Sequence, residues 1–226
     1  MSALASPTPT PYATLLSFTR YVGRTGPAKA TFVTGLRRQR ESGSGFNPHS
    51  QLIKALKADI QFRTGGRHLA EVVSLVKPRW RPLYETLTTG ASAYLESLGD
   101  LTQVRLVPIR DALAVVGGLT VKVNPHLGLR YADGRAEVVR LHFDEDPPST
   151  EGLVSALHLM ARHTDQMLPH AEPVLVDVRR GLAHRRDPAV KDPAAKDAAV
   201  ERWLAGEAVG FSTMWSTTPA RPAASA

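Results

Sequence analysis

The chain has 226 residues, of which 42% are hydrophobic, and its formal net charge at pH 7 is +7. A chain of this length and apolar content can bury a real core, which excludes wholesale disorder. The absence of cysteine excludes disulfides, cysteine nucleophiles and thiolate metal sites, and no apolar run approaches the roughly 18 residues of a membrane span.

The first hundred residues follow a helical pattern. Apolar residues at spacings of three and four predict a helix from Pro11 to about Gly23. Further helices are expected in four stretches: "AKATFVTGLRRQRE", "QLIKALKADIQF" with Ser50 as N-cap, "HLAEVVSLV", and "RPLYETLTTGASAYLESLG" with Gly99 past its end. This part of the chain is therefore predicted to be all-helical.

The pattern then changes to that of strands. "TQVRLVPI" is a strand or an irregular lead-in, and "LTVKV" alternates. "LGLRYADGRAEVVRLHF" predicts a hairpin, because Asp133-Gly134 supplies the positive φ angles of a tight turn. A helix capped by Thr150, a buried strand at "PVLVD" and a last helix over about 195–215 follow, with 182–194 as a connection.

These elements predict an α+β fold: an N-terminal helical region followed by a β-β-β-α-β-α core with a small mixed sheet. The expected division is a basic helical region at 11–100 and a mixed core at 101–217. The Pro-, Ala-, Ser- and Thr-rich segments 1–10 and 218–226 are expected to be disordered tails. The N-terminus lacks a secretory signal pattern, so we expect a soluble cytoplasmic protein without a membrane partner or a cofactor.

The positive charge is unevenly distributed. Residues 1–100 hold 13 lysines and arginines against 6 acidic residues, whereas residues 101–226 hold 15 of each. Such asymmetry indicates a polyanionic partner, DNA or RNA, or else a solvated basic surface with no partner. The residues that could follow a phosphate backbone are Arg37, Arg38, Arg40, Lys54, Lys57, Arg63, Arg67, Lys77, Arg79 and Arg81.

Standard catalytic motifs are absent, including phosphate loops, zinc-spaced histidines and dinucleotide fingerprints. The order meander, helix, strand resembles the core of restriction-endonuclease-like proteins, whose paired carboxylates and lysine would hold a divalent metal and an attacking water. At the matching positions stand Asn124-Pro125-His126 and, in the next strand, Glu137 and Arg140. The histidine replaces an aspartate and the arginine departs from the Glu-x-Lys spacing, so this resemblance does not imply metal-dependent catalysis.

A second hypothesis is an enzyme, a degenerate nuclease or another hydrolase, whose charged cluster on the sheet consists of Glu137, Arg140, His142 and Asp177. The alternative for Arg140 and Asp177 is a buried ion pair. The run Asp144-Glu145-Asp146 precedes a helix, where helix capping is favoured over metal binding. A non-catalytic partner-binding scaffold is a third hypothesis.

Four stretches, "VKVNPHLGL", "VVRLHF", "LHLM" and "VLVDVRRG", occur in this order along the chain. On these stretches the chain from about Tyr12 to Trp215 resembles an uncharacterised family of actinobacterial proteins with a similar Asn-Pro stretch and a similar Asp-Val-Arg-Arg-Gly strand end. The resemblance implies one evolutionary unit and carries no catalytic residue across. Because the excess of positive charge lies in residues 1–100, we expect a nucleic-acid-associated protein that binds through its basic helical half.

Overall fold

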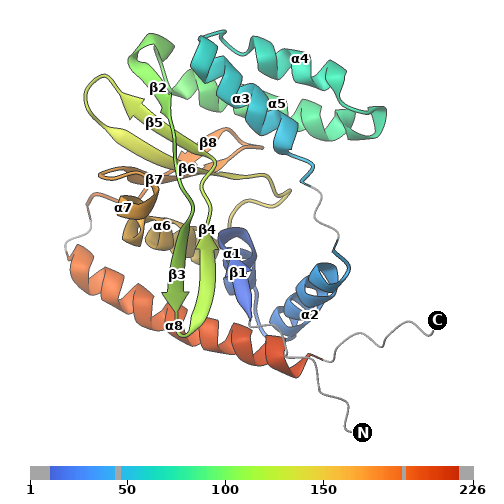
Figure 1. Ribbon diagram of the computed structural model, residues 1–226, viewed down its shortest axis with the longest axis vertical. Helices are drawn as coiled ribbons and strands as arrows, with labels where there is room; N and C mark the ends of the chain where they lie inside the picture. The colour runs from blue at the N-terminus through green and yellow to red at the C-terminus, as the bar shows by residue number, and fades with distance from the viewer. Residues whose placement is uncertain (1–10, 44–46, 190–191, 219–226) are drawn as a thin grey trace, which may run out of the picture.

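The computed structural model describes residues 11–43, 47–189 and 192–218. It is an α+β fold in which two small sheets are packed among helices (Figure 1). One sheet has three strands in the order β1-β4-β3, and the other has five in the order β2-β5-β6-β7-β8. The strands are β1 Tyr12–Thr14, β2 Val104–Val107, β3 Ala112–Val116, β4 Leu119–Val123, β5 Leu127–Tyr131, β6 Ala136–His142, β7 Glu172–Asp177 and β8 Leu182–His184.

One bent β-ribbon belongs to both sheets. Val107 of β2 lies opposite Gly128 of β5, and Ala112 of β3 lies opposite Val123 of β4, so the register is the same on both sides of the bend. Four residues intervene on each arm, and each arm contains a proline, which cannot donate to the ladder. Beyond the bend, β3 and β4 run away from β2 and β5 toward helix α8 (Figure 1).

The five-stranded sheet is antiparallel except at its centre. β6 pairs in parallel with β7, and the intervening chain crosses over through helix α6 (Thr150–Arg162) and the short helix α7 (Thr164–Met167). β6 is buried over nearly its whole length, on both faces, because helices cover the sheet on either side.

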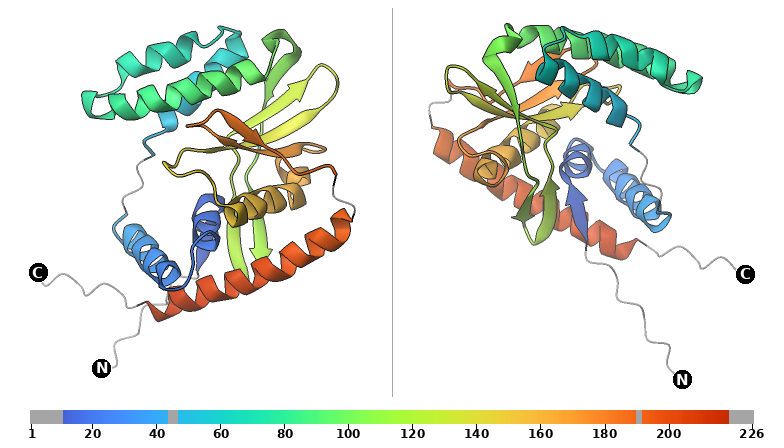
Figure 2. Two further views of the ribbon diagram at one scale, coloured as in Figure 1. Left: turned by 180° about the vertical axis from the view of Figure 1, so that it is seen from behind. Right: turned by 45° about the horizontal axis from the view of Figure 1, so that its top comes forward.

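The remaining helices form two groups around two hydrophobic clusters. α3 (Ser50–Phe62), α4 (Arg67–Leu75) and α5 (Arg81–Ser97), with the 3₁₀ turn η1 (Pro78–Trp80), cover one face of the five-stranded sheet (Figure 2). The other cluster joins the three-stranded sheet and α6 to three further helices. These are α1 Leu15–Val22, α2 Pro27–Glu41 and α8 Pro193–Thr217.

The segment 11–100 is therefore shared between two hydrophobic clusters instead of forming one helical body. It is also not all-helical. The expected helix from Pro11 begins only at Leu15, because residues 12–14 form β1, a strand parallel to β4. Thr14 then caps α1: its hydroxyl accepts from the Ser17 backbone N–H at 3.2 Å.

Other predictions differ from the structure in detail. Strands β3 and β8 were not predicted, and β8 occupies part of the expected connection 182–194. α6 is capped by Ser149 instead of Thr150, and Ser50 is the first residue of α3 instead of its cap. The predicted tails lie outside the described residues, apart from Thr218 at the end of α8. No helix within the described ranges combines the length and the apolar character needed to cross a bilayer.

Gly90 of α5 shows how closely the helical layer approaches the sheet. A Cβ built there would lie 1.8 Å from the Val178 carbonyl oxygen, just after β7. We expect Gly90→Ala to destabilise the fold by about 1–3 kcal/mol or more, since backbone must move to admit the methyl group. Gly35→Ala, in an exposed part of α2 with no atom within 4 Å of the new Cβ, should instead stabilise by about 0.5–1 kcal/mol. Urea unfolding of both variants checks this, and equal stabilities would contradict the close approach.

Candidate anion-binding site

Because the β-ribbon bends, β5 departs from the edge of β6 beyond Val139. β5 pairs with β6 only as far as Leu127, which lies opposite Val139. Beyond that point the His126 backbone N–H donates to the Val139 carbonyl at 2.7 Å, and the His126 ring continues the contact. Its Nδ1 accepts a hydrogen bond from the Leu141 backbone N–H at 3.0 Å. A side chain thus completes the ladder where the strand has turned away.

Arg140 points into this gap and is only 7% exposed. One terminal nitrogen, Nη1, donates to the Asn124 carbonyl at 2.5 Å and lies 3.2 Å from Nε2 of His126. Burial, and to a lesser extent the charge of Arg20, lowers the pKa of Arg140 to about 10, although two carboxylates oppose the shift. The guanidinium is therefore still charged at neutral pH.

The carboxylates near Arg140 are already paired with other cations. Asp111 binds Lys122 at 2.8 Å, and Asp144 binds Arg20 through two hydrogen bonds, one of them 2.6 Å long. Within the described ranges, Arg140 forms no ion pair of its own. A buried guanidinium without a carboxylate is unusual, because a charge removed from water normally has a partner.

Besides Arg140, the site includes His126 and two residues close enough to lower the pKa of His126, namely His49 and Lys57. The His49 ring stacks on Phe143, with centroids 4.3 Å apart and planes 8° from parallel. The pKa of His126 is lowered to about 2, mainly by burial and then by the charges of Arg140, Lys57 and His49. Burial likewise lowers the pKa of His49 to about 4. At neutral pH the site therefore combines cationic Arg140 and Lys57 with two neutral imidazoles.

The loop after β6 is held by side chains that bind its carbonyl oxygens. Arg179 donates to Phe143 O at 3.2 Å, Arg180 donates to Glu145 O at 2.9 Å, and the His142 ring donates to Asp146 O at 3.0 Å. The acidic run 144–146 therefore does not cap α6, whose cap is Ser149. Its first residue, Asp144, is the partner of Arg20 in α1.

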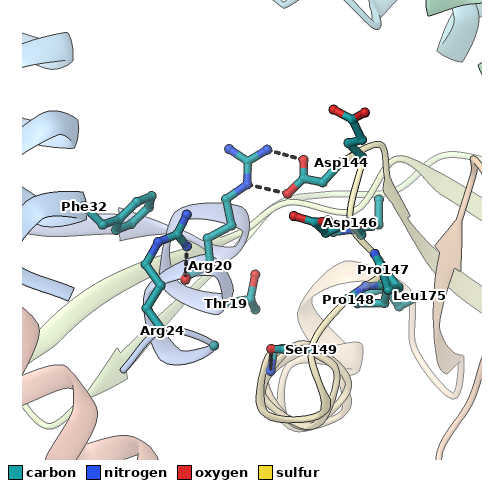
Figure 3. Close-up of a pocket in the computed structure, with 14 residues that line it drawn as sticks. Thr19, Arg20, Arg24, Phe32, Asp144, Asp146, Pro147, Pro148, Ser149 and Leu175 are labelled. Carbon is teal, nitrogen blue, oxygen red and sulfur yellow. Dashed lines mark hydrogen bonds and ion pairs between the residues drawn. The ribbon is translucent and has the colours of Figure 1, made fainter. Parts of the chain in front are cut away.

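A cavity of about 570 Å³ lies between this loop and α1 (Figure 3). Figure 3 shows the side chain of Arg20 reaching Asp144 across its mouth, with Arg24 beneath the ring of Phe32. The guanidinium carbon of Arg24 is 4.3 Å from that ring's centroid. Both arginines that line the cavity therefore already contact other groups of the protein.

The four residues expected to form a catalytic cluster do not converge. Glu137 and Arg140 lie on opposite faces of β6, because side chains alternate along a strand. Glu137 is 1% exposed and accepts hydrogen bonds from Arg185, at 2.9 Å, and from the Tyr131 hydroxyl, at 2.8 Å. It is the buried end of a structural ion pair.

The ion pair expected between Arg140 and Asp177 is not formed. Asp177 pairs with Arg180 at 2.8 Å, three residues along the chain. Asp177 does lie directly opposite His142 in the parallel β6–β7 register, but no hydrogen bond or ion pair joins these two within the described ranges. Of the four, only Arg140 reaches the gap beside His126.

The ten cations expected to bind nucleic acid also separate into groups. Arg37 is buried and donates to the carbonyls of Trp215 and Thr218 at 2.6 and 2.7 Å, which ties α2 to α8. Arg40 donates to Tyr12 O and lies over the rings of Tyr12 and Trp215. Lys57 is half-buried, near His126. The exposed ones are Arg38, Lys54, Arg63, Arg67, Lys77, Arg79 and Arg81.

The residues at this site do not fit a divalent metal. No group of three His, Cys, Asp or Glu side chains in the described ranges is placed to hold one. The nuclease-like resemblance is based on the predicted order of meander, helix and strand. Membership of that class stays a prediction, since protein-family models give no match and no curated protein matches the chain significantly.

Arg37 and Arg38 allow a direct test of which cation is structural. Arg37→Met should lower the free energy of unfolding by about 1–3 kcal/mol, because two carbonyl oxygens lose their charged donor. Arg38→Met, one residue away but exposed, should change it by less than about 0.5 kcal/mol. Urea denaturation measures both, and equal losses would show that the two carbonyl contacts contribute nothing.

The low pKa of His49 predicts an acid-sensitive fold. In the unfolded chain His49 is protonated below about pH 6.5, whereas in the folded protein its ring is protonated only below about pH 4. Protonation therefore favours the unfolded chain, and the free energy of unfolding falls as pH decreases through this window. At pH 5 the loss from His49 should be about 1 kcal/mol relative to pH 7.5, because solvent screening reduces the effect at a partly exposed ring. His49→Phe, which keeps the stacking on Phe143, should remove that share of the pH dependence. Unfolding curves at both pH values check it, and identical pH dependence in the two proteins would contradict it.

Proposed function

We propose that the protein binds nucleic acid through its phosphates, at the gap beside β6 and along the adjoining helix α3. The observation that carries the proposal is Arg140, a buried guanidinium that forms no ion pair with a carboxylate in the described part of the chain. Guanidinium groups match phosphate oxygens in geometry and charge, and a phosphate would supply the missing anion.

The charge on helices α3, α4 and α5 also favours a ligand that carries phosphates. Residues 50–97 contain seven lysines and arginines against four acidic residues. One of those acids, Asp59, is fully buried and binds the first backbone N–H groups of α4, including Leu69 N at 2.9 Å, so it does not offset the surface charge. On α3, the exposed Lys54 lies one turn before the half-buried Lys57. Phosphates of a strand bound along α3 would contact these two lysines one after the other.

Contacts of this kind carry no base recognition, so we expect little sequence preference. The enzyme alternative has no comparable support, because its four residues are divided between the two faces of β6 and internal ion pairs. DNA and RNA, single-stranded or duplex, are distinguished by the experiment.

Fluorescence anisotropy with labelled 20-mers tests the proposal. Binding should be detectable at low salt, and the logarithm of the affinity should fall linearly with the logarithm of salt concentration. Lys54→Ala/Lys57→Ala should reduce that slope by about 1.4 on single strands or about 1.8 on duplex. The matched control is Arg135→Ala/Arg162→Ala, which removes two exposed arginines that pair with Asp133 and Glu201 and should leave the slope unchanged. No binding of any of the four nucleic acids at low salt would refute the function.

A further inference from the structure

The hydrogen bonding of His126 determines where its proton lies. A neutral imidazole has one donor nitrogen and one acceptor nitrogen. Nδ1 accepts from the Leu141 backbone N–H at 3.0 Å, so the ring proton must be on Nε2. The ring is neutral at pH 7, since burial and the neighbouring cations lower its pKa.

Two donors therefore face each other across the gap. Nε2–H of His126 lies 3.2 Å from Nη1 of Arg140, and a guanidinium nitrogen has no acceptor capacity. Nη1 has an acceptor in the Asn124 carbonyl, but Nε2 of His126 has none in the described part of the chain. Two converging N–H groups with a positive charge are the arrangement that an oxyanion accepts from.

The burial of Arg140 limits the form of that oxyanion. A phosphodiester within a strand carries the chain on both sides, and both ends must leave the site. A phosphomonoester has one substituent and presents three oxygens and up to two negative charges to the site. With Arg140 7% exposed and His126 half-buried, a terminal group fits the gap better than an internal one.

We propose that His126 and Arg140 form a seat for a terminal phosphate, so that the protein binds phosphorylated ends of nucleic acid. One oxygen accepts from Nε2–H of His126 and from the guanidinium, and Lys57 adds long-range attraction. This inference rests on the proposed function for its source of the phosphate, whereas the seat itself is a property of the two side chains.

The first experiment uses the wild-type protein and three oligonucleotides of one sequence: 5′-phosphorylated, 3′-phosphorylated and unphosphorylated. At least one phosphorylated form should bind about tenfold tighter or more than the unphosphorylated form, as expected for hydrogen bonds to a charged group. Arg140→Met should abolish this difference, so that the phosphorylated and unphosphorylated oligonucleotides bind this variant equally. Equal affinities of all three for the wild type would overturn the seat and leave the proposed function standing.

The second experiment is independent of any variant and of any oligonucleotide. ¹⁵N NMR of the histidine rings should show His126 as the Nε2–H tautomer, and titration with inorganic phosphate should shift its Nε2 resonance. An Nδ1–H tautomer, or no shift at saturating phosphate, would overturn the seat. A phosphate-induced shift in a protein that binds none of the oligonucleotides would support the seat and refute the nucleic-acid function, so the two proposals fail separately.

Discussion

The bend in the β-ribbon connects the two hydrophobic clusters and also creates the candidate site. On one side of the bend the ribbon extends the five-stranded sheet, and on the other it forms the three-stranded sheet with β1. Pro108 and Pro125 stand in the bend, where an amide that cannot donate interrupts the ladder. Because β4 and β5 turn away from β6 there, a strand edge that would otherwise be paired becomes open to side chains.

Charge pairing then distinguishes the cations that have structural partners from Arg140, a buried cation for which the described residues provide no carboxylate partner. Arg37 binds backbone carbonyls, Arg20 binds Asp144, and Arg185 binds the buried Glu137. Each of these cations has its partner within the protein. Arg140 is as buried as Arg37 but has no carboxylate, and it faces a histidine that also donates. A phosphate at this position would relieve an electrostatic cost that the fold by itself does not offset.

Most helices and the β5–β6 hairpin follow from local patterns. Apolar residues at helical spacing predicted α2 to α6 and α8, and Asp133-Gly134 marked the turn of the hairpin. The helical pattern extends over β1, which is a strand in the structure, because three residues are too few to show an alternating pattern. β3 and β8 were missed for a similar reason: β3 follows an irregular segment, and β8 is another three-residue strand within a charged connection.

The sequence by itself determined the class of fold, the order of its longer elements and the excess of positive charge, because these depend on residue type and short-range spacing. It also singled out Asn124-Pro125-His126 and Arg140. Only the tertiary structure decided which cations are free, because their partners are remote in the chain: Asp144 is 124 residues from Arg20. The gap also depends on the tertiary structure, because His126 contacts Arg140 where the ribbon bends away from β6.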